Sequence, residues 1–362
     1  MTNRLPQLSA NLHTPAAVAL CLSLAFTASP ALDAAPAPQS AAQIAASRVS
    51  SIQIVLPPRL VAGGPATLAT IGADHRLIGH VAVELGHGKS IQTDATGRAN
   101  FTVGSGSVLI ARAGGSSAAA LIDSQSAASS EAGIRVPRFA ALHNGFDVCG
   151  TGFDGNAEND RVEVDAQAAL VLAASPECLI VVPGAAAAPG MAKISIEGSS
   201  PVEGLTVTLV SLGFEPPQPP LTAGTKGWLT VRARGSNEPL RIMVENQSLD
   251  VLQFEKGDTQ EVLTSGGMQN TARIQVQAIR SGDFSFHARV LPPPDFDAAR
   301  RFLEAAEPLA IGDLPKTLEK MKDELAHHPK NAGRIRAGLD QMLEVTSPSD
   351  FRALLEAARS AL

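Results

Sequence analysis

Hydrophobic and polar residues alternate in short runs along the first three quarters of the chain, and helical spacing replaces this alternation near the end. Between residues 51 and 291 the apolar runs are short and are separated by Gly, Pro and Asp. A period of two places successive side chains on opposite faces of a strand. Frequent turn signals between such runs are typical of β-sandwiches. The pattern therefore predicts a mainly β chain made of tandem sandwich domains.

The first predicted sandwich covers residues 48–123. Its expected strands lie at 51–56, 66–71, 80–85, 99–103, 107–111 and 118–122. A turn is expected at 93–98, where Asp94 can bond local amides and Gly97 can take positive φ. A strand at 81–85 followed by Thr-Asp-x-x-Gly-x-Ala at 93–99 is similar to bacterial immunoglobulin-like domains of the invasin and intimin type. This resemblance implies an immunoglobulin-like sandwich that acts as a spacer or adhesion module.

A Ser- and Ala-rich linker at 124–133 precedes the second predicted sandwich, residues 134–197. This segment contains Gly-x-Gly-Phe at 150–153, Val-x-Val at 162–164, Ala-Ser-Pro at 174–176 and Pro-Gly-x-Ala at 189–192. The order and spacing of these motifs resemble an IPT/TIG domain, another immunoglobulin-like fold. The resemblance implies a second immunoglobulin-like sandwich.

Two cysteines fall within this second segment. Cys149 and Cys178 form an even pair in a chain that we expect to be exported, which favours a structural disulfide over two buried thiols. The bridge would close a loop of about 30 residues, and in the chain-entropy model such a bridge stabilises the fold by roughly 3–4 kcal/mol. Because Val148 and Leu179 mark the core faces, alternation predicts that the bridge lies on the outer face.

The third predicted sandwich covers residues 203–292. Its expected strands begin at 205–210 and follow at 228–233, 240–244, 251–254, 261–263, 272–278 and 284–288. We interpret Trp228 as a core residue of this domain rather than a stacking platform for a ligand. No family is assigned to this segment.

Charge density rises sharply after Pro294. In residues 295–362, 22 of 68 residues are Asp, Glu, Lys or Arg. Apolar residues now recur with helical spacing, which predicts four short helices near 296–307, 314–327, 331–344 and 349–361. The sequence Ser-Pro-Ser-Asp at 347–350 predicts a helix start with a Ser cap and Pro in the first turn. These helices either form a bundle, pack on the last sandwich, or dock a protein partner.

The N-terminus carries a signal for export. No charged residue occurs between Arg4 and Asp33, and an apolar run of about a dozen residues lies between them. We predict a signal peptide over residues 1–34, cleaved after Ala31 or Ala34, and a flexible spacer over residues 35–47. No later stretch is apolar enough for a membrane helix, so we expect no transmembrane segment in the mature chain. The expected location is the periplasm, the outer surface or the medium.

Composition excludes several partners and offers no reaction. The net charge of −6 disfavours nucleic acid as a partner, and a single Trp with no Tyr disfavours carbohydrate. The acidic loop at 154–160 has oxygen ligands but lacks EF-hand spacing, so a solvated turn is favoured over a calcium site. We assign no catalytic, cofactor-binding or metal-binding residue and expect no cofactor.

Three functions remain open at this point. The favoured one is a non-catalytic, exported modular protein of a bacterial envelope that serves in adhesion, as a scaffold or in extracellular binding. The alternative is an accessory subunit of a secreted or envelope complex that docks a protein partner through residues 295–362. Apolar helix stripes exposed to solvent would favour that alternative, and stripes buried in a compact bundle would count against it. A hydrolase with a non-standard site is the least favoured.

Overall fold

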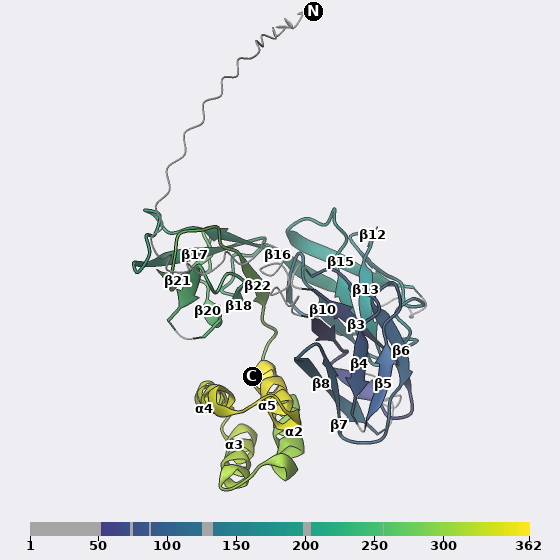
Figure 1. Cartoon of the computed structure of the whole chain (residues 1–362). Coiled ribbons are helices and arrows are strands. Elements are labelled where there is room, and N and C mark those ends of the chain that lie inside the picture. Colours follow the sequence, from purple (N-terminus) through teal and green to yellow (C-terminus); the bar gives the residue numbers. More distant parts are fainter. Residues whose placement is uncertain (1–51, 73–74, 87, 125–132, 198–203, 256) are drawn as a thin grey trace, which may run out of the picture. The chain divides into compact units, whose positions relative to one another are not determined.

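The computed structural model describes residues 52–72, 75–86, 88–124, 133–197, 204–255 and 257–362. Strands dominate the chain up to Val290, and four helices follow within the described residues (Figure 1). The predicted class, a mainly β chain of sandwiches with a helical C-terminal region, is confirmed. The predicted signal peptide and spacer, residues 1–47, lie outside the described residues. No helix of the described segments is both long and apolar enough to cross a bilayer.

Two facing sheets form the first sandwich. One contains β1 (Gln53–Val55), β3 (Pro65–Ile71) and β6 (Arg98–Thr102). The other has the order β2 (Arg59–Val61), β8 (Ser116–Asp123), β7 (Val108–Ala113), β4 (Ala82–Leu85) and β5 (Lys89–Gln92). The inward residues form one core that includes Leu60, Leu68, Val83 and Ala120. Alternation placed these side chains inside because every second residue of a strand points to the same face.

The second sandwich is built in the same way. Its first sheet contains β13 (Leu170–Ala174), β14 (Cys178–Val182) and β10 (Phe146–Cys149). Its second sheet contains β12 (Gln167–Ala168), β11 (Val162–Val164), β15 (Gly190–Ile196), the first half of β16 (Thr206–Glu215) and β9 (Phe139–Ala141). Val148, Leu179 and Ile194 are fully buried in the core between these sheets.

Strand β16 takes part in two sandwiches. Its residues 206–209 pair with β15, and its residues 211–215 pair with β17 (Lys226–Arg234). Val207 and Leu209 therefore belong to the second core, whereas Val210 belongs to the third. One uninterrupted strand thus connects the two sandwiches, and there is no flexible linker at residues 206–215. The division of the chain into domains at 197 and 203 remains a prediction.

The third sandwich pairs a sheet of four strands with a sheet of three. The first runs β16, β17, β21 (Thr271–Ala278) and β19 (Leu252–Phe254). The second runs β20 (Thr259–Leu263), β18 (Arg241–Asn246) and β22 (Phe286–Val290). Leu229, Val231, Ile242 and Val244 are fully buried between them.

The four helices match the predicted ranges closely. They are α2 (Phe296–Ala306), α3 (Leu314–His327), α4 (Ala332–Val345) and α5 (Asp350–Ala361). The predicted Ser cap of α5 is Ser349, whose hydroxyl accepts a hydrogen bond from the amide of Arg352. The predicted place of Pro348 in the first turn was wrong, because this residue precedes the cap. The β-region backbone of Ser349 is what a capping residue requires.

Candidate functional site

Cys149 and Cys178 form a disulfide, as the sequence predicted. They lie directly opposite each other on β10 and β14, with their Cα atoms 4.1 Å apart. The amide of Cys149 donates to Arg135 rather than to β14, so this is the close, non-hydrogen-bonded type of cross-strand pair. That spacing lies slightly below the usual range for bridged cysteines, which is about 4.4–6.8 Å between Cα atoms.

The bridge lies on the sheet face opposite the core, and around Cys178 this face is covered by protein. Cys178 is fully buried, and its neighbours on that face, Ala173 and Ile180, pack with Ala69 of β3. Residue Ala174 of β13 also pairs with Thr67 of β3. The face that alternation identified as outer therefore contains a second buried cluster. The disulfide within it has a structural role, since neither cysteine is a free, reactive thiol.

The acidic loop at 154–160 is held by protein groups. Asp160 accepts a hydrogen bond from the amide of Asp154, and Asn159 donates to the Asp154 carboxylate. Thr67 reaches into the same loop, where its hydroxyl donates to the carbonyl of Gly155 and accepts from the amide of Ala157. Burial raises the pKa of Asp160. Within the described residues no cluster of three His, Cys, Asp or Glu side chains suits a metal ion.

The apolar stripes of the helices are buried. Leu303, Leu318, Leu339 and Leu355 are fully buried in one cluster, which also contains Leu121 of β8. The helices thus pack on each other and on the outward face of the five-stranded sheet of the first sandwich. This is the outcome that we expected to count against partner docking through residues 295–362. It also differs from packing on the last sandwich, which was one of the predicted options.

Ion pairs connect the helical region to the first and third sandwiches. Arg301 of α2 pairs with Asp123 of β8 at 2.8 Å, and Arg112 of β7 pairs with Asp350 of α5. On the third sandwich, Glu261 of β20 pairs with Arg336 of α4. Leu309, Ile311 and Val345 remain exposed.

Four titratable side chains meet where β10, β22 and the turn after β3 approach one another. The rings of His75 and His287 are stacked, with centroids 3.7 Å apart. Burial, together with the nearby His75 and Arg289, lowers the pKa of His287 to about 4. Asp147 keeps contact with water, yet the crowding of protein atoms around it raises its pKa to about 6 against the attraction of Arg289. Two of these groups therefore have pKa values shifted toward their neutral forms. The sequence did not predict this cluster, because His75 was considered only as a zinc ligand and was rejected.

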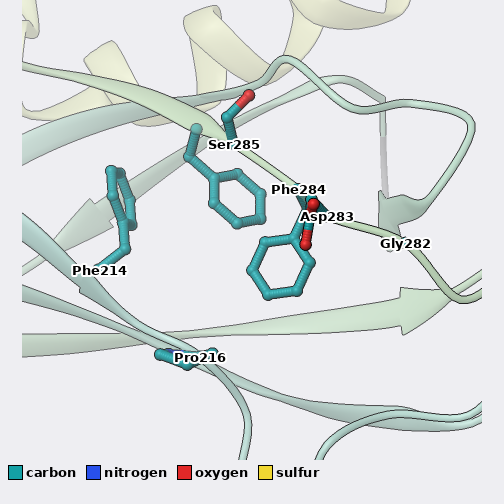
Figure 2. Close-up of a pocket in the computed structure, with 7 residues that line it drawn as sticks. Phe214, Pro216, Gly282, Asp283, Phe284 and Ser285 are labelled. Atoms are coloured by element: carbon teal, nitrogen blue, oxygen red, sulfur yellow. The ribbon is translucent and has the colours of Figure 1, made fainter. Parts of the chain in front are cut away.

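A phenylalanine-lined pocket opens in the third sandwich, with a volume of about 440 Å³ (Figure 2). The residues that line it are Phe214, Pro216, Gly282, Asp283, Phe284, Ser285 and Phe286. It forms where the end of β16 and the start of β22 leave their sheets, so aromatic core residues face solvent there. The rings are packed together, because Phe286 lies 5.3 Å from Phe214 and 5.6 Å from Phe284.

Chemically, the pocket suits an apolar group. Three of its seven lining residues are phenylalanines, and the Asp283 carboxylate is the one charged group among them. An aromatic or branched aliphatic side chain would bury apolar area there at about 25 cal/mol per Å². Sequence reasoning missed the pocket. The only signal for it was the concentration of Phe at 284 and 286 just after the turn at 281–283.

Trp228 is not a core residue, so the sequence interpretation was wrong. Its side chain is 47% exposed on the outward face of β17, next to Arg273, whose guanidinium lies 4.9 Å from the centre of the ring. The neighbours Leu229 and Val231 point inward instead. The register of β17 was set by the aliphatic residues at odd positions, which bury more completely than an amphipathic indole.

Comparisons with known proteins give no family. No protein-family model and no curated protein matches the chain. Among solved structures, the chain is similar to the plexin A4 extracellular region, with 11% identity and a TM-score of 0.26 over 66% of this chain and 23% of that chain. The I9–I11 tandem of titin gives 10% identity and a TM-score of 0.18, covering 66% of this chain and 94% of that chain. E. coli alpha-2-macroglobulin gives 12% identity and a TM-score of 0.16, covering 66% and 19%.

The chain thus spans less than a quarter of plexin A4 and of alpha-2-macroglobulin. TM-scores below 0.5 do not establish a common fold. The architecture therefore rests on the strand order, the register and the cores described above.

Proposed function

We propose that this chain is an exported, non-catalytic binding protein of a bacterial envelope, with a protein partner that docks on the third sandwich. In this proposal the first sandwich is an invasin-type immunoglobulin-like module and the second an IPT/TIG domain. The disulfide supports export, because such bridges persist in oxidising compartments. The first two sandwiches serve as the support that presents the third.

The phenylalanine pocket is the observation that carries the proposal. A pocket of about 440 Å³ lined by Phe214, Phe284 and Phe286 leaves apolar area open to water. Such concave apolar sites are where binding energy concentrates, because an inserted side chain is desolvated on all sides. A partner residue such as Phe, Leu or Ile fits this pocket chemically.

Site-specific photocrosslinking tests the proposal. A benzoylphenylalanine replaces Phe284 in the exported full chain, and cells are irradiated before the envelope is isolated. Two control positions carry the same probe: Met268, which is 97% exposed, and Ile311 in the helical region, which is 79% exposed. We expect one defined protein adduct at position 284 and none at 268.

An adduct at position 311 with none at 284 would reject the pocket and favour docking through the helices. The unlabelled variant Phe284→Ala should lose the same partner in a chemical crosslinking experiment while keeping its far-UV circular dichroism. A panel of esterase, peptidase and glycosidase substrates supplies the remaining arm. Turnover by the purified chain would contradict the non-catalytic assignment.

A further inference from the structure

The outward face of the four-stranded sheet in the third sandwich has an unusual composition. Register and alternation place one set of side chains on this face: Ser211, Gly213 and Glu215 of β16; Lys226, Trp228, Thr230, Arg232 and Arg234 of β17; Thr271, Arg273, Gln275 and Gln277 of β21; and Gln253 of β19. We call this set the Trp228 face. It contains the chain's single tryptophan and three glutamines.

Much of the Trp228 face is accessible to solvent in the described part of the chain. The elements that pack closely against β17, β19 and β21 are strands of the same sandwich. Trp228 itself is 47% exposed, and Gln253 and Arg273 are exposed as well. The face is therefore open to a ligand from solvent.

The Trp228 face is positively charged in a chain whose net charge is −6. It carries four cations against one anion, Glu215, which is paired with Arg232 at 2.7 Å. Within the described residues, Lys226, Arg234 and Arg273 have no carboxylate at ion-pair distance. Local excess of one charge sign favours partners of the opposite sign, so this face is suited to an acidic ligand.

The side chains around Trp228 favour a sugar over a protein. Gln275 lies directly opposite Trp228 on β21, and the Gln253 amide donates to Gln277 at 3.3 Å. Amides offer paired donors and acceptors, which suit vicinal hydroxyls. A protein interface would need an apolar centre around its aromatic anchor, and here the neighbours of Trp228 are Gln, Thr and Arg.

Arg273 adds specificity for a carboxylate. Its guanidinium is held over the indole of Trp228 at 4.9 Å by cation–π attraction. A guanidinium held in this way keeps its N–H fork available for bidentate binding of a carboxylate. The exposed part of the indole can stack on the C–H face of a pyranose ring.

We propose that the Trp228 face binds an acidic polysaccharide of uronic acids, with Trp228 stacked on a sugar ring and Arg273 bound to a ring carboxylate. This goes beyond the proposed protein partner and uses different residues from the phenylalanine pocket. It also revises the expectation that carbohydrate is disfavoured, which rested on the presence of one Trp and no Tyr.

Fluorescence titration of the exported full chain tests this proposal directly. Because the chain has one Trp, its emission reports the face alone. The probes are polygalacturonate, poly-L-glutamate of equal charge, and a neutral galactan. We expect polygalacturonate to change Trp228 emission and to bind at least about tenfold more tightly than either other polymer, which corresponds to about 1.4 kcal/mol.

Variants separate the sugar from a general charge effect. In isothermal titration, Trp228→Ala and Arg273→Gln should each weaken polygalacturonate binding at least tenfold. Arg161→Gln removes the same charge from an exposed site on the second sandwich and should leave affinity unchanged. Gln275→Ala, a small change beside Trp228, should weaken binding while leaving the fold intact.

Three outcomes would overturn the proposal. The first is no binding of polygalacturonate at millimolar uronate. The second is equally tight binding of poly-L-glutamate with no effect of Trp228→Ala, which would indicate an acidic protein as the ligand of this face. Equal loss in Arg161→Gln and Arg273→Gln would show that only net charge matters. Retained binding of polygalacturonate in the Phe284→Ala variant separates this site from the proposed protein-docking pocket.

Discussion

Removal of the Cys149–Cys178 bridge should destabilise the second sandwich by about 3–4 kcal/mol. The cysteines are 29 residues apart, and in the chain-entropy model a bridge over such a loop removes that much disorder from the unfolded chain. The two cysteines are paired directly opposite each other on adjacent strands, so strand pairing keeps them close in the folded state even without the bridge. The bridge is therefore expected to act mainly on the unfolded chain. The double variant Cys149→Ala with Cys178→Ala should lose additional free energy of unfolding, because removal of the sulfur leaves a cavity at fully buried Cys178.

Hydrogen exchange in increasing urea, followed by mass spectrometry, measures this loss at peptides from β10 and β14. The matched control is the wild type in reductant, which removes the cross-link but keeps both sulfur atoms. Wild type in reductant should lose about 3 kcal/mol, and the double variant slightly more. A loss below about 1 kcal/mol in both would refute the reasoning, because the bridge would then restrict an unfolded chain that is already compact.

Three further perturbations test the fold and its charges. Leu303→Ala empties a fully buried site between the helices and the first sandwich and should cost about 2–4 kcal/mol by urea unfolding, whereas no change would mean that α2 is not docked there. Ser349→Ala removes the α5 cap and should cost about 1 kcal/mol in the same assay, with Ser349→Asp as the variant that retains stability. His287→Gln should gain free energy of unfolding relative to wild type as pH falls from 6.5 to about 4, because His287 is protonated in the unfolded chain over this range but not in the folded chain. The raised pKa of Asp147 acts in the opposite direction but is present in both proteins, so melting temperatures at pH 7.5 and 4.5 isolate His287, and a constant difference between them would contradict the assignment.

Local patterns were sufficient for most elements. The helix at 314–327 was predicted at both ends, because apolar residues at helical spacing and a Pro at 329 are local signals. Strand β15 was also visible, since its alternation over 190–196 is complete. The short strands β2 and β9 were missed, because three residues carry too little alternation to be recognised.

The pairing of elements far apart in sequence was not predictable in the same way. Ile110 and Leu121 face the helices rather than the core of the first sandwich. Their strands are apolar on both faces, which indicates two covered faces but does not say what covers the second. Only the tertiary structure shows that residues from 296 onward return to that sheet.

The sequence by itself determined the class, the helices and the change from sparse to dense charge, because each depends on neighbouring residues or on spacing within one element. The cysteine pair followed instead from the even count and the expected compartment. The tertiary structure decided which sheet face is buried, which two sandwiches share β16, and where aromatic side chains remain exposed to solvent. Trp228 shows the physical reason. A strand has two faces, and the choice between them depends on how much apolar area partners from distant parts of the chain can bury on each.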